Sequence, residues 1–338
     1  MSTIEEIEQN LLRPSPALVS DIRDLEGDIL ILGVGGKMGP SLARLARQAV
    51  DQAGVSKRVI GVSRFSERHL REELEADGIE TVAADLLEED QLQALPDAAN
   101  VLYLAGTKFG TTGKEAFTWA MNAYLPGRVA DRYRNSRIVA FSTGNVYPFT
   151  PVVSGGPAED HPVGPVGEYG QSCLGRERVF QYFSDKYNTP LLLYRLNYAI
   201  DLRYGVLLEI ARAVQEGKAI DLTTGNVNVI WQGDANEIAL RALKHCDVPA
   251  KVLNVTGPET VSIQWLAGQF GKLFGKEPVF VNEVQPTALL SNAAEANRLF
   301  GYPRVTLRQM IDLTADWLSS GGKTLNKPTH FQKRTGQF

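Results

Sequence analysis

The sequence is poor in cysteine, and it has neither a long apolar run nor a cluster of basic residues. With only Cys173 and Cys246 among 338 residues, it indicates neither a disulfide framework nor a zinc site, and a reducing cytoplasm is the simplest location. No apolar run approaches the roughly 20 residues that span a membrane. The net charge of −4, with scattered lysines and arginines, gives no basis for nucleic-acid binding. The four histidines are too dispersed to bind a metal, so we expect no metal, membrane or nucleic-acid partner.

The chain does contain a strand, a glycine-rich turn and a helix in direct succession over residues 28–50. A short apolar run leads into the turn, and apolar residues recur at helical spacing after it. The glycines of the turn stand three residues apart, at Gly33, Gly36 and Gly39. Lys37 and Met38 fall where the helix would present its N–H groups to a phosphate. The pattern predicts dinucleotide binding, and a turn without chemical importance is the alternative.

Two residues after the next predicted strand indicate which dinucleotide is bound. The run 57–64 ends about 24 residues beyond Gly39, where a dinucleotide fold places its ribose-recognising residue. An acidic side chain there would accept a hydrogen bond from a free ribose hydroxyl, whereas this chain has Ser63 and Arg64. A hydroxyl and a guanidinium can hold a 2′-phosphate. We therefore expect a preference for NADP over NAD, with a solvated arginine as the alternative.

The remaining pattern predicts an α/β protein with a doubly wound, Rossmann-like parallel sheet and a smaller C-terminal substrate-binding lobe. Residues 1–27 would form a helical extension, opened by a capping box at Thr3 and Glu6. Residues 28–196 would form the dinucleotide-binding domain, with contributions from about 221–245. Residues 197–320 would form most of the lobe, and 321–338 an exposed tail. Further strands are predicted over 79–86, 100–106, 137–143 and 191–196, and helices over 67–76 and 117–133.

Other motifs follow the glycine turn in order along the chain. They are Asp85-Leu86, Ala105-Gly106, Asn122, the segment from Ser142 to Tyr147, the segment from Tyr169 to Ser172, and Arg195-Leu196-Asn197. Over about residues 28–320 the set resembles an extended short-chain dehydrogenase/reductase of the NAD-dependent epimerase/dehydratase family.

This resemblance implies roles for individual residues. Thr143 would be the catalytic hydroxyl, with Ser142 beside it, and Tyr169 would exchange a proton with the substrate. The positions implied for the cofactor are Gly33, Gly36, Lys37, Met38, Gly39, Asp85, Leu86, Ala105, Gly106, Asn122, Tyr169 and Asn197. A homodimer is also expected by resemblance.

The sequence departs from the family pattern at Cys173. The family's tyrosine is followed four residues later by a lysine, whose charge lowers the tyrosine pKa, and a thiol supplies no such charge. One explanation is an active enzyme in which another cation compensates, with Lys108 or Lys114 as candidates and Arg176 as a poorer one, roughly 10 Å along the helix axis. A second is an altered enzyme in which Tyr169 stays protonated.

A third explanation is a cofactor-binding sensor or scaffold, for which Cys173 is only a small core residue. A thiolate nucleophile at a helix start is a further alternative, although no histidine lies near Cys173 in the sequence. The sequence thus favours an NADP-preferring oxidoreductase or epimerase acting on a sugar-like or other hydroxylated carbonyl compound. A sensor with little catalysis remains the competing hypothesis.

Overall fold

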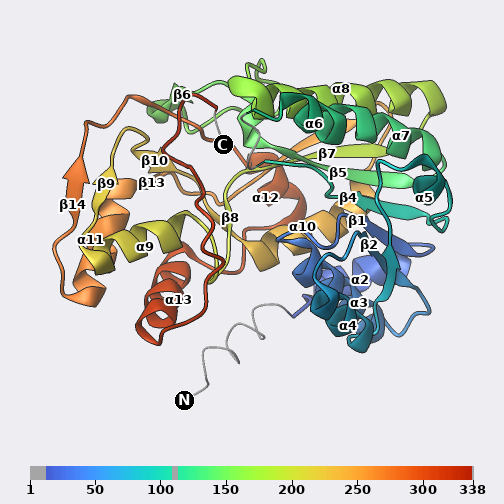
Figure 1. The fold of residues 1–338 in the computed structure, drawn as a ribbon, viewed down its shortest axis with the longest axis horizontal. Helices are drawn as coiled ribbons and strands as arrows, with labels where there is room; N and C mark the ends of the chain where they lie inside the picture. The colour runs from blue at the N-terminus through green and yellow to red at the C-terminus, as the bar shows by residue number, and fades with distance from the viewer. Residues whose placement is uncertain (1–12, 109–112, 337–338) are drawn as a thin grey trace.

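A seven-stranded parallel sheet forms the centre of the larger part of the molecule (Figure 1). The structure is a computed structural model that describes residues 13–108 and 113–336, so the predicted capping box at Thr3 lies outside the described residues. The strand order is β12-β7-β5-β4-β1-β2-β3, and all neighbours pair in parallel. The strands are β1 (Ile29–Leu32), β2 (Val59–Ser63), β3 (Glu80–Ala83), β4 (Asn100–Tyr103), β5 (Arg137–Thr143), β7 (Leu191–Leu196) and β12 (Lys251–Val255).

Helices cover both faces of this sheet, which explains why β1 is apolar at every position. Ile29 and Ile31 pack into one core layer, and Leu30 and Leu32 pack into the layer on the opposite face. This burial on both sides is typical of parallel sheets. The first layer is covered by α2 (Pro16–Asp24), α3 (Gly39–Ala53) and α10 (Gln232–Ala242), and the second by α7 (Leu125–Arg132) and α8 (Gly167–Tyr187). The predicted doubly wound α/β fold is confirmed.

The chain changes its direction across the sheet beside β1. The next strands, β2 and β3, extend the sheet on one side of β1, whereas β4, β5, β7 and β12 lie on the other. In open α/β sheets the crevice at the carboxyl ends of the strands at this switch point is where ligands bind. The glycine turn follows β1, and the loop beginning at Leu104 follows β4, so both lie at this crevice.

A smaller, mainly helical part packs around its own apolar core. This core joins α9 (Val206–Glu216), α11 (Ile263–Phe274) and α13 (Leu307–Ser319), and it includes the buried ring of Trp231. Between α9 and α11 the chain returns to the sheet through α10 and β12. The short strands are β6 (Thr150–Pro151), β8 (Ala199–Ile200), β9 (Ala219–Asp221), β10 (Asn226–Val227), β11 (Ile230–Trp231), β13 (Val261–Ser262), β14 (Val279–Val281) and β15 (Thr287–Ala288).

The remaining helices of the described residues are short or interrupted. They are α4 (Arg68–Ala76), α5 (Glu89–Gln93), α6 (Glu115–Trp119) and α12 (Ala294–Phe300). The helix predicted over 117–133 consists of α6, a wider π-helical turn over Ala120–Tyr124, and α7. Across the part of the chain that the structure describes, no helix has both the length and the apolar character needed to cross a bilayer.

The C-terminal segment is not the exposed tail that the sequence predicts. In Figure 1 it runs from α13 along the boundary between the two parts of the molecule toward α8. Thr329 and Phe331 are buried, and the backbone N–H of Thr329 donates to Glu209 of α9 at 2.8 Å. The Arg334 guanidinium donates to the Thr287 carbonyl at 2.8 Å. The prediction failed because these isolated apolar and hydroxyl residues have no periodic spacing that marks them as packed.

Candidate functional site

The glycine turn brings backbone close to backbone at both of its ends. Gly33 has a φ of +92°, and a β-carbon there would lie 2.8 Å from the Ala105 nitrogen after β4. At the start of α3, a β-carbon on Gly39 would lie 2.1 Å from the Val34 carbonyl oxygen. A side chain is excluded at both positions, so α3 begins directly over the carboxyl end of β1. This geometry fits a pyrophosphate held at a helix N-terminus.

A first cavity of about 250 Å³ lies beside this turn and contains most of the residues predicted to bind the adenosine half of a cofactor. Its lining includes Gly33, Gly36, Ser63, Arg64, Asp85, Leu86, Ala105 and Gly106. The exposed Arg64 guanidinium lies 4.0 Å from the Asp85 carboxylate, so it stands at the mouth of the cavity. The sequence prediction and the geometry therefore agree on which segments meet here.

Asn122 lies behind the cavities and is not part of either lining. Its side-chain oxygen accepts hydrogen bonds from the Thr107 N–H at 2.9 Å and from Arg176 at 2.8 Å. Its amide group donates to the Thr107 carbonyl at 2.9 Å and to the Ser172 hydroxyl at 3.0 Å. These four bonds use its full hydrogen-bonding capacity. Asn122 therefore ties the loop after β4 to α8, and a direct contact with a cofactor stays a prediction.

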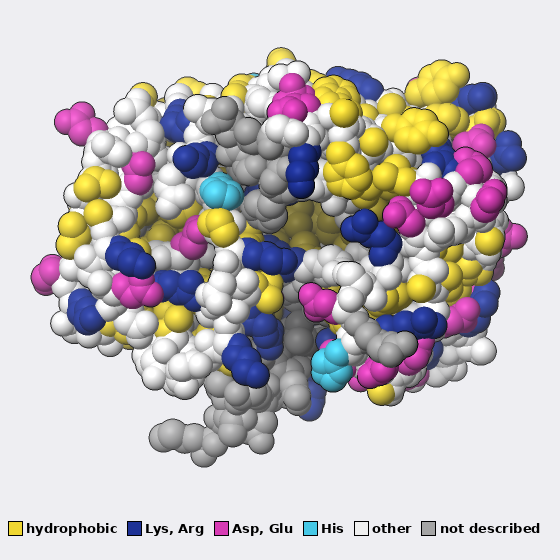
Figure 2. All heavy atoms as spheres, viewed as in Figure 1, with side chains coloured by type: hydrophobic (Ala, Val, Ile, Leu, Met, Phe, Trp, Pro, Cys, Tyr) yellow, Lys and Arg dark blue, Asp and Glu magenta, His cyan; other side chains and the backbone are white. Residues whose placement is uncertain are grey.

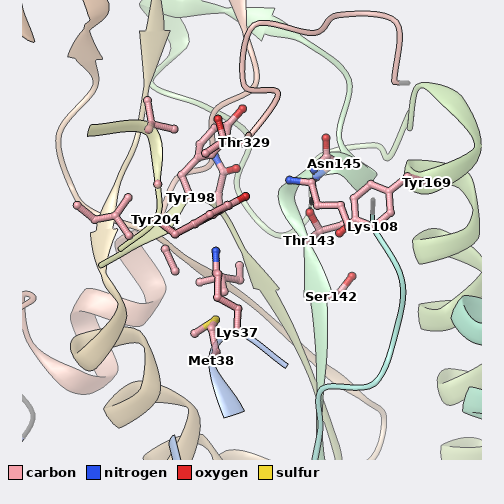
Figure 3. Close-up of a pocket in the computed structure, with 16 residues that line it drawn as sticks. Lys37, Met38, Lys108, Ser142, Thr143, Asn145, Tyr169, Tyr198, Tyr204 and Thr329 are labelled. Carbon is pink, nitrogen blue, oxygen red and sulfur yellow. Dashed lines mark hydrogen bonds between the residues drawn. The ribbon is translucent and has the colours of Figure 1, made fainter. Parts of the chain in front are cut away.

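A second cavity of about 250 Å³ contains the predicted catalytic residues (Figure 3). Thr143 at the end of β5 hydrogen-bonds to Tyr169 of α8, and both line the cavity. The Thr143 hydroxyl also accepts from the Asn145 N–H at 3.2 Å and from the Asn145 side chain at 3.0 Å. Asn197, Lys37 and Met38 complete the set of predicted residues in this lining. Residues separated widely in the sequence thus line one cavity together with Tyr169.

Ser142 also borders this cavity, but its hydroxyl is engaged elsewhere. It donates to the buried Glu177 carboxylate at 2.5 Å. Arg195 holds the same carboxylate through two hydrogen bonds, at 2.9 and 2.7 Å. The buried ion pair between Glu177 and Arg195 therefore fixes β7 to α8, and Ser142 belongs to that network. A catalytic role for Ser142 stays a prediction, and Thr143 is the better-placed hydroxyl.

Residues 29–255 match the model of the NAD dependent epimerase/dehydratase family. The chain belongs to this family. A search of curated protein sequences found no match. Among solved structures, UDP-glucuronic acid 4-epimerase from Bacillus cereus in complex with NAD is 19% identical, with a TM-score of 0.71, and the alignment covers 87% of this chain and 96% of that one.

Two further solved structures have the same fold. UDP-glucose 4-epimerase from Thermotoga maritima, with UDP-glucose, is 16% identical with a TM-score of 0.69, covering 87% of this chain and 99% of that one. An epimerase from Methanothermobacter thermautotrophicus is 17% identical with a TM-score of 0.71, covering 90% and 96%. At these identities the likeness establishes the shared fold of the epimerase/dehydratase family.

Cys173, which the sequence resemblance places at the position of the family's lysine, is fully buried. Its side chain packs with Val146 and Tyr147 and contacts the Tyr169 hydroxyl. Burial raises the pKa of the thiol, so the protein disfavours the thiolate. Cys173 is also the seventh residue of α8, well inside the helix. Neither position nor environment supports the alternative of a thiolate nucleophile.

The environment of the Tyr169 phenol favours its protonated form. Loss of contact with water raises the pKa of Tyr169 above its usual value, and the neighbouring Cys173 adds to the shift. The positive charge of Arg176 and the hydrogen bond with Thr143 oppose it. The phenol is therefore present in its protonated form, but the raised pKa makes it a weaker acid, so formation of the phenolate requires help from a nearby cation.

Two of the three candidate cations lie near Tyr169. Lys108 lines the second cavity, with its Nζ atom 5.8 Å from the centre of the Tyr169 ring. Arg176 is buried in the protein interior, and its guanidinium donates to the Phe141 carbonyl at 2.7 Å. The third candidate, Lys114, lies at the start of α6 outside both linings.

Arg176, which the axial distance in α8 made the poorer candidate, nevertheless acts on the Tyr169 pKa through its charge. Helical side chains lean toward the N-terminus of their helix, and the arginine chain spans much of that distance. Other lining residues were not among the predicted site residues, namely Asn145, Tyr198, Tyr204 and Thr329, although Asn145 lies within the predicted segment from Ser142 to Tyr147. Tyr198 directly follows a predicted site residue, but no spacing pattern distinguishes the set.

Proposed function

We propose that the chain is an NAD(P)-dependent epimerase or oxidoreductase that acts on a hydroxyl or carbonyl group of a sugar-like substrate. The observation that carries the proposal is the contact between Thr143 and Tyr169 at a cavity that also includes the glycine turn's Lys37 and Met38. When bound there, a nicotinamide would accept or return a hydride. The UDP-sugars named with the similar structures support a nucleotide sugar as substrate.

Thr143 and Tyr169 would share the handling of the substrate oxygen. Because Asn145 donates to the Thr143 hydroxyl, the proton of that hydroxyl can point toward a substrate carbonyl and polarise it. The raised pKa of Tyr169 keeps the phenol protonated at neutral pH, so it can donate a proton to the same oxygen. In the oxidative direction Tyr169 would take the proton of a substrate hydroxyl.

Lys108 and Arg176 would supply the positive charge that the family takes from its lysine. Both approach the phenol, Lys108 from the cavity and Arg176 from the protein interior. Burial lowers the pKa of Lys108 to about 8, so its ammonium group is charged at neutral pH and loses its charge as the pH rises through that value. The rate in the oxidative direction should therefore decline above pH 8. Deprotonation of a phenol alone would instead raise the rate as the pH rises.

We also propose that the cofactor is NADP. Ser63 and Arg64 line the first cavity at the end of β2, where a 2′-phosphate would meet a hydroxyl and an exposed guanidinium. No glutamate or aspartate occupies these two positions, which leaves the nearby Asp85 as the acidic group of the described lining. Asp85 already lies close to Arg64, and it could accept a hydrogen bond from a free ribose instead.

A homodimer fits the distribution of exposed aromatic side chains. Phe117, Trp119, Tyr124 and Tyr182 are exposed on the adjoining surfaces of α6, the π-helical turn and α8. The corresponding area is rich in yellow at the upper right of Figure 2. Contiguous apolar surface of this kind marks an interaction site. Sedimentation equilibrium would test whether the chain forms a dimer. A cytoplasmic location stays a prediction.

A sensor or scaffold is the second candidate function, and one observation favours it. The resemblance places the thiol of Cys173 where the family has its lysine, and both cavities are nevertheless present. A protein that binds the cofactor but converts little substrate would have both cavities and no lysine beside the tyrosine.

Two measurements separate the candidates. Fluorescence titration with NADPH and NADH should give saturable binding, and the absence of binding for both would overturn both functions. A turnover screen on UDP-sugars, free sugars and aldehydes should then reveal activity if the chain is an enzyme. Saturable binding with no turnover on any of these substrates would favour the sensor.

A further inference from the structure

Residues 321–336, which we call the strap, contact both parts of the molecule beside the second cavity. The strap leaves α13 in the smaller part and runs toward α8 in the larger part (Figure 1). On its way it brings Thr329 into the lining of the second cavity, which also includes Tyr169 (Figure 3). The strap is therefore a part of the wall around the proposed reaction site, although it lies far from the family motifs in the sequence.

The first half of the strap is fixed to the smaller part. The Leu325 N–H donates to the Arg203 carbonyl at 3.0 Å, and the Thr329 N–H donates to Glu209 of α9 at 2.8 Å. The Phe331 ring is buried in the apolar core around α9, α11 and α13. Residues 196–206, the segment that Leu325 contacts, supply half of the 16 residues that line the second cavity. This half of the strap thus holds one wall of the cavity.

The second half of the strap ends against the helix that carries Tyr169. Gly336 has a φ of +71°, and a β-carbon there would lie 2.2 Å from the Val166 carbonyl oxygen. A β-carbon on Gly167 would in turn lie 2.5 Å from the Gly336 carbonyl oxygen. Two backbones therefore touch where only glycine fits. Because Gly167 begins α8 and Tyr169 lies in the first turn of that helix, this contact bears directly on the wall that contains the phenol.

The side-chain attachment of this second half is weaker than the burial of the first. The Arg334 guanidinium donates to the Thr287 carbonyl at 2.8 Å and lies 4.1 Å from the centre of the Phe149 ring. Both partners are neutral, so the contact lacks the energy of a buried ion pair. The end of the strap at Gly336 can therefore detach while Phe331 stays in its core.

We propose that the strap holds the two walls of the second cavity together, and that the site is closed for reaction only while Gly336 is attached at the start of α8. The inference rests on the proposed function, because it takes the second cavity as the substrate site. A substrate bound against residues 196–206 reaches the Tyr169 phenol only if the first turn of α8 keeps its place. Detachment of Gly336 lets the walls separate, which admits the substrate and releases the product.

Hydrogen–deuterium exchange of the full-length protein without cofactor tests this proposal. Gly336→Ala places a methyl group against the Val166 carbonyl and should detach the end of the strap. Amide exchange should then become at least about fivefold faster in the first two turns of α8 and in residues 196–206, because both walls open locally. Gly321→Ala is the matched control: Gly321 has a similar φ of +74°, but no atom lies within 4 Å of its added β-carbon. It should leave exchange in both walls unchanged.

A second pair of variants removes the side-chain attachment instead of the backbone contact. Arg334→Met should accelerate exchange in the same two walls, and Lys333→Met, which removes the neighbouring charge, should not. Faster exchange confined to the strap, with both walls as in the wild type, would overturn the proposal. Unchanged exchange in both Gly336→Ala and Arg334→Met would overturn it as well.

Kinetics with a substrate identified in the turnover screen separate this proposal from the proposed function. Gly336→Ala should lower kcat/KM at least about tenfold, because the phenol and the substrate are no longer held in register. Its affinity for NADPH should stay nearly unchanged, since no residue of the strap lines the first cavity. Wild-type kcat/KM in this variant would overturn the role of the strap while the proposed function stands. If the wild type binds no cofactor and turns over no substrate, the proposed function fails, and the exchange data still decide whether the strap joins the two walls.

Discussion

The two cavities differ in where their functional groups originate. In the first cavity, the groups come from the turns that follow β1 to β4, so each belongs to a local motif that the family pattern contains. In the second, the positive charges of the lining come from the glycine turn and from the loop after β4, and Arg176 of α8 lies buried outside the lining. If the proposed function holds, the cofactor end of the site follows the family pattern, whereas residues outside that pattern supply the charge at the catalytic end.

The largest expected effect comes from Tyr169→Phe. It removes the proton donor but leaves the ring, so turnover should fall about 100-fold to 10,000-fold. Affinity for NADPH should fall much less than turnover, because most of the predicted cofactor positions line the first cavity, which does not include Tyr169. Steady-state kinetics and fluorescence titration measure the two quantities. Equal turnover in the variant and the wild type would show that the phenol is not the proton donor.

Introducing the family's lysine at position 173 should lower the stability of the protein. Cys173→Lys would bury an ammonium group whose neighbours include the buried Arg176, and both desolvation and like-charge repulsion disfavour it. We expect a loss of about 3 kcal/mol or more in the free energy of unfolding, measured by urea denaturation. Cys173→Ala, which introduces no charge, is the matched control and should cost much less.

The opposite outcome for Cys173→Lys would contradict the difference that we infer between the two cavities. If the variant keeps its stability and gains turnover, the space for the family lysine is intact and no other cation compensates for it. The sensor hypothesis would then be favoured over compensation by residues outside the family pattern.

Lys108→Met should reduce turnover about tenfold to 100-fold, because it removes the cation that faces the phenol from the cavity. The decline of the wild-type rate above pH 8 should disappear in the variant, since that decline follows the deprotonation of Lys108. A pH–rate profile measures both effects. Lys114→Met is the matched control from the start of α6 and should retain the wild-type profile. An unchanged profile in Lys108→Met would leave Arg176 as the compensating cation.

The sequence predicts the first cavity far better than the second, and the reason is physical. The turn at Gly33 and the strand ending at Ser63 are local patterns, and a parallel sheet brings their ends to one edge. Lys37, Lys108 and Arg176 meet near the substrate space only through tertiary packing and side-chain direction. Thr329 comes from a segment that lacks any periodicity, so its place in the lining could not be inferred.

The smallest effect is expected at the mouth of the first cavity, where Arg64→Ser should weaken NADPH binding about tenfold and leave NADH binding nearly unchanged. The reason is that a guanidinium contact contributes only when a 2′-phosphate is present. Arg58→Ser, near the opposite end of β2 and paired with Asp28, is the matched control for general loss of charge. Titration of both variants with both cofactors checks this. An equal loss for NADPH and NADH would assign Arg64 to the part that the two cofactors share, and the first cavity would then have no preference for a phosphate.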